Sequence, residues 1–134
     1  MKLNIDCVRD VLLTLEDAEF GGRTTIAALC EKLDNKYTEE EVEYTCLKLA
    51  EGGLIEAELV SIMGFALKGV KAVNDITYDG HQFIANIRQN TTWNKVKDVS
   101  KKVGASSISA VLQIASSLAK EAITSFFANP KPML

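Results

Sequence analysis

The residues with the widest chemical range lie in one stretch, ITYDGHQFIANIRQNTTWNK, which runs from Ile76 to Lys95. It holds the only histidine of the chain, His81, and the only tryptophan, Trp93. A general base needs an orienting acid and a substrate pocket. Asp79 is close to His81, but neither a nucleophile motif nor a phosphate-binding glycine loop accompanies it. We therefore expect a protein that is not an enzyme, with His81 in the first turn of a helix.

Metal binding and redox chemistry are not predicted either. His81 has no second histidine to join it, and Cys7, Cys30 and Cys46 show no C-x-x-C spacing. Cysteines in apolar helical patterns are typically reduced and buried. We expect no metal, no cofactor and a reducing compartment.

The composition is that of a folded globular protein. Of the 134 residues, 47% are hydrophobic and 25% are charged, and this length supports one domain with room for an appended helical segment. The N-terminus places Asp6, Arg9 and Asp10 where a signal peptide needs an uninterrupted apolar stretch. No run approaches the length of about 18 apolar residues that spans a membrane. We expect neither secretion nor a membrane role.

Charge is unevenly distributed along the chain. Residues 1–60 carry 6 basic and 14 acidic side chains, a balance of -8, whereas residues 61–134 carry 9 and 4, a balance of +5. Such polarity can direct a basic surface toward a polyanion, but it also suits head-to-tail self-association or attraction within one molecule. The candidate DNA-contacting residues are basic side chains of the second half: Lys68, Lys71, Arg88, Lys95, Lys97, Lys101 and Lys102. The alternative is that they only form a hydrated surface.

Apolar periodicity predicts a mainly helical chain with two strands. Helical periodicity indicates helices over residues 5–18, 26–33, 39–53, 93–104 and 106–128. Alternation of apolar and acidic residues indicates a strand over 54–60, and residues 72–77 are a second strand candidate. Thr38 and Glu41 form a capping box at the start of the third helix. The stretch ITYDGHQFI resembles the segment that follows the last wing strand in many winged-helix proteins. This resemblance implies that Thr77 is the N-cap of a further helix, that Gly80 permits close packing and that Phe83 is an apolar anchor.

This order of elements resembles that of a winged helix-turn-helix. We therefore predict a mainly α, α+β fold with a two-stranded β-hairpin wing and a C-terminal helical extension. The predicted parts are a winged-helix domain at residues 1–90, an extension at 91–129 that forms one compact unit with it or a dimerisation element, and a tail at 130–134.

Four motifs in order carry a more specific resemblance. They are D-x-x-R-x-x-L-L at Asp6–Leu13, E-x-G-L-I-E-A at Glu51–Ala57, T-x-x-G-H-x-F at Thr77–Phe83, and T-x-W-N-K-x-K, which corresponds to Thr92–Lys97. In this last motif Thr92 stands directly before Trp93, and Thr91 stands one position earlier. Together they resemble a family of small phage and prophage proteins that is catalogued as a domain of unknown function. The resemblance covers about the whole chain and implies a bacterial host cell, but it implies no activity.

The third helix opposes the usual DNA-binding mode of a winged helix, in which this helix enters the major groove. Its expected outward face is predominantly acidic and consists of Glu40, Glu41, Tyr44, Lys48 and Glu51. Carboxylates repel a polyanion, so DNA contact would have to use the wing and the later basic residues.

Apolar residues point instead to a protein partner. The wing tip is unusually apolar, with Ile62, Met63, Phe65 and Leu67, and the last helix has a wide apolar stripe that includes Leu118 and Phe126. The stripe either packs within one molecule or pairs with a second copy. The candidate protein-contact residues are Glu40, Glu41, Tyr44, Phe65, Leu67, Leu118 and Phe126.

These observations predict a cytoplasmic binding module with a regulatory or accessory role. Its partner is expected to be a second copy of itself or another phage or host protein. The alternative is a DNA-binding transcriptional regulator that uses the wing and the basic residues. No membrane partner is expected.

Overall fold

The computed structural model describes residues 1–61, 68–105 and 107–128. These residues form six α-helices and one three-stranded antiparallel sheet. In chain order the elements are α1 (Ile5–Leu15), β1 (Thr24–Thr25), α2 (Ile26–Lys32), α3 (Glu39–Glu51), β2 (Ile55–Ser61), β3 (Lys68–Ile76), α4 (Tyr78–Ile87), α5 (Asn90–Val103) and α6 (Ile108–Ala128). The predicted mixed and mainly helical class is confirmed.

Side-chain caps fix the starts of the first three helices. The Asn4 side chain accepts hydrogen bonds from the first-turn amides of α1, and Thr25 accepts one from the Ala28 amide of α2. At α3, Thr38 accepts the Glu41 amide at 3.1 Å, as the capping-box prediction requires. The Glu41 carboxylate, however, accepts the Asn4 side-chain amide at 2.7 Å and so joins α3 to the start of α1.

The sheet has one more strand than the sequence predicts. Its strand order is β1-β3-β2, with Thr24 and Thr25 of β1 paired with Val73 and Ala72 of β3. The predicted two-stranded hairpin is therefore incomplete, because two residues are too few for alternation to be seen in a sequence. Strand β3 also begins at Lys68, before the expected start at residue 72.

The core joins the helices on the sheet with the later helices. The buried side chains of α1 to α4 form one cluster with Trp93 and Val96 of α5 and with Ile108, Val111 and Ala115 of α6. Trp93 is only 3% exposed, so its ring belongs to this core. Its helix starts at Asn90, three residues before the predicted start.

The three cysteines are buried and carry free thiols. Burial raises the pKa of Cys7 to about 11 and that of Cys46 to about 12. It also raises the pKa of Cys30. The prediction of reduced, unreactive thiols fits these positions, because a protonated thiol is a poor nucleophile.

The helix entry after the sheet forms as predicted. Thr77 accepts the Gly80 amide at 3.1 Å and donates its hydroxyl to the Gly53 carbonyl at 2.6 Å. A Cβ atom at position 80 would lie 2.1 Å from the backbone oxygen of Leu54. Glycine at position 80 is what allows α4 to pass this close to the junction between α3 and β2.

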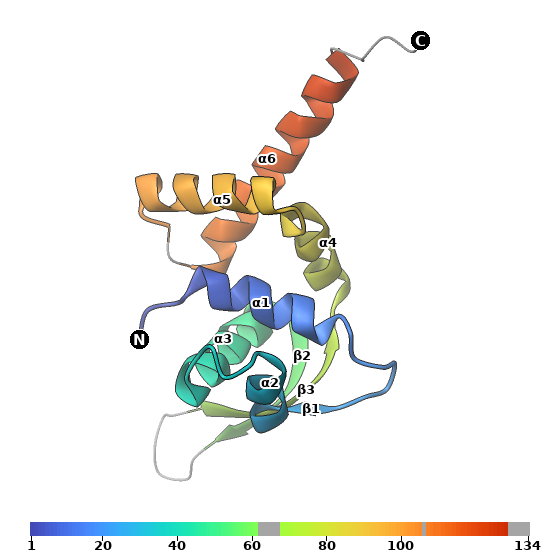
Figure 1. The fold of residues 1–134 in the computed structure, drawn as a ribbon, viewed down its shortest axis with the longest axis vertical. Coiled ribbons are helices and arrows are strands. Elements are labelled where there is room, and N and C mark those ends of the chain that lie inside the picture. Colours follow the sequence, from blue (N-terminus) through green and yellow to red (C-terminus); the bar gives the residue numbers. More distant parts are fainter. Residues whose placement is uncertain (62–67, 106, 129–134) are drawn as a thin grey trace.

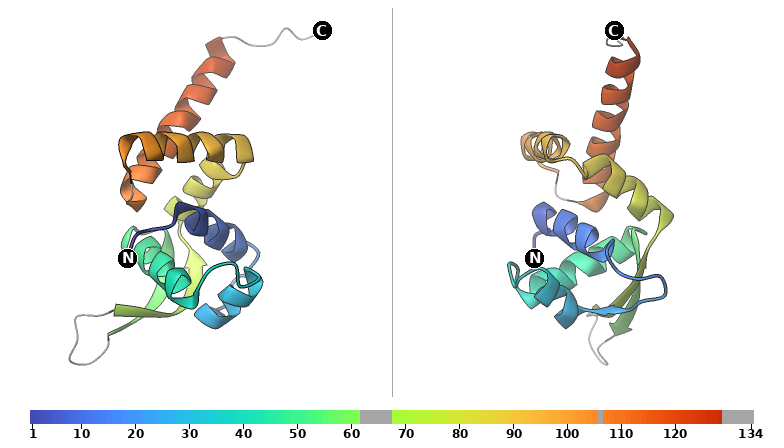
Figure 2. Two further views of the ribbon diagram at one scale, coloured as in Figure 1. Left: turned by 60° about the vertical axis from the view of Figure 1, so that its left-hand side comes forward. Right: turned by 45° about the vertical axis from the view of Figure 1, so that its right-hand side comes forward.

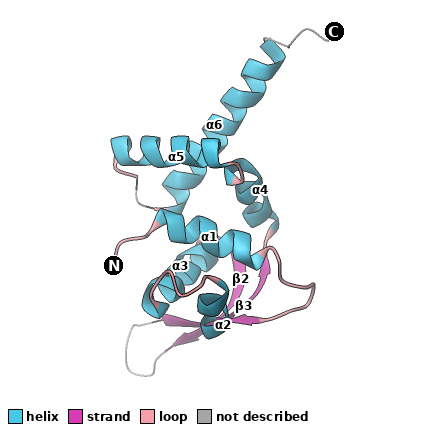
Figure 3. Ribbon diagram, in the orientation of Figure 1, coloured by secondary structure: helices cyan, strands magenta, loops and turns pink. Residues whose placement is uncertain are grey.

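The elements form a body with a projecting arm. Helices α1, α2 and α3 lie with the sheet, α4 leads away from it, and α5 lies across α6 (Figure 1 and Figure 3). The C-terminal part of α6 extends beyond all other elements in each view (Figure 2). In the described parts of the chain, no helix combines the length and the apolar character needed to cross a membrane.

Candidate functional site

Two of the motif residues hold α1 against the later helices. Arg9 donates hydrogen bonds to the carbonyls of Ile87 and Arg88 at 3.0 and 2.7 Å and to the Asn90 side chain at 2.9 Å. Its guanidinium also lies over the Trp93 ring, 5.8 Å from the ring centre. Arg9 therefore binds the end of α4 and the start of α5 at the same time.

Asp6 completes this contact. Its carboxylate accepts the Trp93 indole N–H at 3.0 Å and lies 3.3 Å from the Lys97 ammonium. Burial raises the pKa of Asp6, but the hydrogen bonds from Trp93 and Lys97 outweigh it, and the net pKa is lowered. We call Asp6, Arg9, Trp93 and Lys97 the α1–α5 clasp. Its residue types match two of the four motifs, so these motifs have a structural role.

Two residues of the predicted basic surface form ion pairs within the chain. Lys97 pairs with Asp6, and Arg88 makes a two-pronged ion pair with Glu16 on α1. Lys95, Lys101 and Lys102 are exposed on α5, whereas Lys68 and Lys71 are exposed on β3. Figure 1 shows β3 and α5 on opposite sides of the body. The structure therefore does not bring the candidate DNA-contacting residues together.

The α3 face is less open than its sequence predicts. Of the candidates, Glu40 is exposed, whereas Glu41 and Tyr44 are half-buried. The Lys48 ammonium lies over the Tyr44 ring and pairs with Glu51 at 2.9 Å. These residues border a pocket of about 490 Å³ whose other walls come from the N-terminal residues 1–3 and the start of α6.

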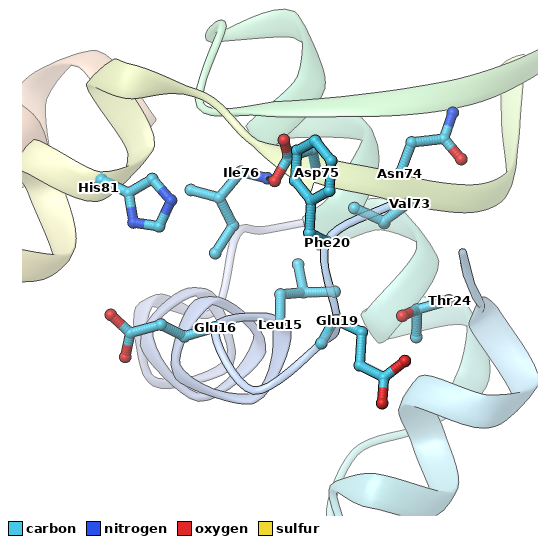
Figure 4. A pocket seen from close by; sticks show the side chains of 11 residues that line it. Leu15, Glu16, Glu19, Phe20, Thr24, Val73, Asn74, Asp75, Ile76 and His81 are labelled. Atoms are coloured by element: carbon cyan, nitrogen blue, oxygen red, sulfur yellow. Dashed lines mark hydrogen bonds between the residues drawn. The ribbon is translucent and has the colours of Figure 1, made fainter. Parts of the chain in front are cut away.

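His81 borders a shallow pocket of about 210 Å³ between α1, the loop after it and β3 (Figure 4). The Glu16 carboxylate beside it already accepts Arg88, which lowers the pKa of Glu16. Asp79, two residues before His81 in the sequence, lines a different pocket next to α6. Among the described residues, no group of three or more His, Cys, Asp or Glu side chains could hold a metal ion. Glu19 and Asp75 also border the His81 pocket, and no described residue makes a hydrogen bond or an ion pair with the His81 side chain.

The last helix exposes an apolar face. Val111 and Ala115 are buried, and the same side of α6 continues through Ala119, Ala122 and Phe126 beyond the body. Ile123, Phe126 and Phe127 are 57%, 66% and 73% exposed. We call Ala119, Ala122, Ile123 and Phe126 the distal α6 face.

An apolar groove adjoins this face. It lies between α5 and α6, has a volume of about 510 Å³, and is bordered by Val99, Val103, Ile114 and Leu118. Val103 is 66% exposed, and Leu118 is half-buried. Of the predicted protein-contact residues, Leu118 and Phe126 thus belong to one continuous surface. Phe65 and Leu67, with the rest of the apolar wing tip, lie outside the described residues.

Residues with structural roles were missing from the sequence-based candidates. Asn4, Asp6 and Arg9 gave no functional signal beyond the D-x-x-R spacing, and only their partners on α3 and α5 explain them. Phe20 is fully exposed in the loop beside the His81 pocket, and no periodicity marks such a loop residue.

Comparison with known proteins assigns the chain to a protein family. No solved structure matches the chain significantly. A protein of Haemophilus influenzae named "Uncharacterized protein" is 29% identical over 120 residues, which cover 88% of this chain and 95% of that protein. The family described as "Hypothetical protein (DUF2513)" matches residues 2–106, which include α1 to α5. The chain therefore belongs to the DUF2513 family, a domain of unknown function.

Proposed function

We propose that the protein is a non-enzymatic binding module of the winged-helix type that acts through protein–protein contacts. Its role is regulatory or accessory, in the bacterial cytoplasm, as the resemblance to phage and prophage proteins suggests. The element order α1-β1-α2-α3-β2-β3 and the strand order β1-β3-β2 support the winged-helix assignment. In the His81 pocket no described carboxylate is hydrogen-bonded to His81, which favours binding over catalysis.

The observation that carries the proposal is the exposed apolar end of α6. Ile123, Phe126 and Phe127 together expose on the order of 350 Å² of side-chain surface. A contiguous apolar patch of this size on a monomer often marks an interaction site. The patch lies on a projecting helix, where a partner can reach it from several sides (Figure 2). The function we assign to α6 is therefore recognition of a protein.

Photo-crosslinking in bacterial cells tests this proposal. A benzophenone amino acid at position 126 is expected to form a protein adduct, because this side chain faces the partner. The same probe at Thr124, which is also exposed but lies on the other side of α6, is the control and should give little adduct. Equal labelling from both positions, or none from position 126, would contradict a specific protein contact.

DNA binding is the second candidate, because Lys95, Lys101 and Lys102 are exposed together on α5. They would contact phosphates without reading sequence. Reversing these three charges should abolish retention of random duplex DNA at low salt, and retention by the wild type should fall steeply as salt rises. Lys97 must stay unchanged, because it belongs to the α1–α5 clasp. Retention that survives the reversal would reject this surface.

A further inference from the structure

We propose that the distal α6 face binds the same face of a second copy of this chain, with the two helices antiparallel. This inference rests on the proposed function and names its partner. Two copies of this face match each other in side-chain size and in charge, and together they are large enough for a dimer interface.

Side-chain size favours an antiparallel pair. Ala119, Ala122, Ile123 and Phe126 stand at positions i, i+3, i+4 and i+7, which lie on one side of a helix. Antiparallel pairing about a twofold axis near residues 122 and 123 places each Phe126 against Ala119 of the other copy. A large side chain then fills the space left by a small one, as in knobs-into-holes packing.

Charge favours the same partner. None of the four residues of the distal α6 face is ionisable, so two copies meet without like-charge repulsion. The nearby charges lie outside this face: Lys120 borders the pocket beside α4, and Glu121 borders the groove between α5 and α6. A basic or acidic partner would find no complementary charge on this face, and a single lysine is too little for an anionic lipid surface.

The extent of the surface predicts a dimer of moderate affinity. Phe127, which is 73% exposed, lies at the edge of the distal α6 face and adds to the area that pairing covers. The buried area is then on the order of 1,000 Å² in total, near the lower limit for a specific interface. We therefore expect the dimer to dissociate on dilution.

The helix itself gains from such a partner. From Glu121 to Phe127 every side chain is exposed, so packing within one chain does not stabilise these two turns. Thr124, Ser125 and the two phenylalanines are only moderate helix formers, and short helical segments are marginal in water without packing. Pairing with a second copy supplies the missing contacts.

Sedimentation velocity over a range of concentrations measures the expected dimer. The wild type should approach twice its chain mass of 14.6 kDa at high concentration and dissociate on dilution. Phe126→Asp should remain monomeric, with an unchanged melting temperature of the body because this side chain is outside the core. Thr124→Asp adds the same charge to the other side of the helix and should dimerise like the wild type.

Disulfide trapping measures the orientation of the helices. In an antiparallel pair centred near residues 122 and 123, Ala122→Cys should cross-link to itself under mild oxidation. Ala119→Cys should not, since the two copies of residue 119 lie roughly 10 Å apart along the axis. Cross-linking of both variants would indicate parallel helices and overturn the proposed arrangement. The wild type is the background control, because its thiols are buried.

The outcomes separate this inference from the proposed function. A wild type that stays monomeric at all concentrations, or a Phe126→Asp variant that still dimerises, overturns the pairing. If position 126 nevertheless forms an adduct with a different protein in cells, the proposed function stands and its partner is not a second copy. If neither dimer nor adduct forms, both are wrong.

Discussion

At the scale of single residues, the α1–α5 clasp explains more of the sequence than any reactive group does. Arg9 and Asp6 stand at the start of the chain and hold a junction nearly 80 residues later, between α4 and α5. The sequence motifs indicated that these residues matter together. The motifs did not indicate how these residues act, because the spacing of residues along α1 does not show which distant carbonyl groups or which indole their side chains contact.

Replacing Arg9 should loosen this junction. Arg9→Ala removes three hydrogen bonds and a cation–π contact, and we expect the free energy of unfolding to fall on the order of 2 kcal/mol. Arg9→Lys keeps the charge but not the planar fork of donors, so it should recover little of the loss. Urea titration followed by Trp93 fluorescence measures both variants. Full stability of Arg9→Lys would show that charge alone holds the junction.

Acid should weaken the fold partly through Asp6. Its pKa in the folded chain lies below the ordinary value of 3.8, so its charged form stabilises the fold above the unfolded pKa. This contribution is lost as the pH falls below about 4 and through the lower folded pKa. Asp6→Asn should therefore be less stable than the wild type at neutral pH and show a shallower loss of stability toward acid.

Urea midpoints between neutral and acidic pH measure this slope. Asp98→Asn is the matched control, since Asp98 is an exposed carboxylate on α5, and it should retain the wild-type slope. If Asp6→Asn and the wild type lose stability in parallel, another group controls the acid response.

At the scale of elements, the start of α4 shows what a sequence can and cannot predict. The roles of Thr77 and Gly80 are predicted from the resemblance to a winged-helix segment together with residue type, because an N-cap and a close approach have strong residue preferences. The start of α5 was placed three residues late, and its N-cap residue, Gln89, makes no side-chain capping bond that could have marked it. The two residues of β1 form a strand only because they pair with β3, and no local sequence pattern predicts this pairing.

Gly80 offers a sharp test of the packing at this helix. Gly80→Ala places a Cβ atom against the Leu54 backbone oxygen and the Ile76 side chain, so α4 has to shift. We expect a loss of about 3 kcal/mol in the free energy of unfolding. Gln82→Ala, at an exposed position of the same helix, should change stability by less than about 0.5 kcal/mol. Thermal denaturation of both variants compares them, and equal melting temperatures would refute the close approach.

At the scale of the whole molecule, the later helices are part of the core that stabilises the sheet. Trp93, Val96, Ile108 and Val111 belong to the same buried cluster as the side chains of α1 to α4. The boundary at residue 90 is predicted from the end of the winged-helix pattern, with an extension that forms one compact unit with the domain or a dimerisation element. Such a pattern cannot show that the next helix returns to cover α1.

Truncation should reveal how far the core extends. A chain of residues 1–90 loses α5 and α6, leaves the core side of α1 uncovered, and should lack the cooperative thermal transition of the full protein. A chain of residues 1–120 keeps the buried part of α6 and should retain the cooperative thermal transition. Far-UV circular dichroism measures both fragments. If the 1–90 fragment melts like the full chain, the body is a domain of its own.

The burial of the three thiols has a practical consequence. Cys7, Cys30 and Cys46 lie on α1, α2 and α3, one in each helix, and are protected from alkylating reagents while their helix stays in place. The rate at which each thiol is alkylated therefore reports how often its own helix opens in the native, unlabelled protein. Cys30 is the least deeply buried, at 8% exposure, so α2 is expected to open first.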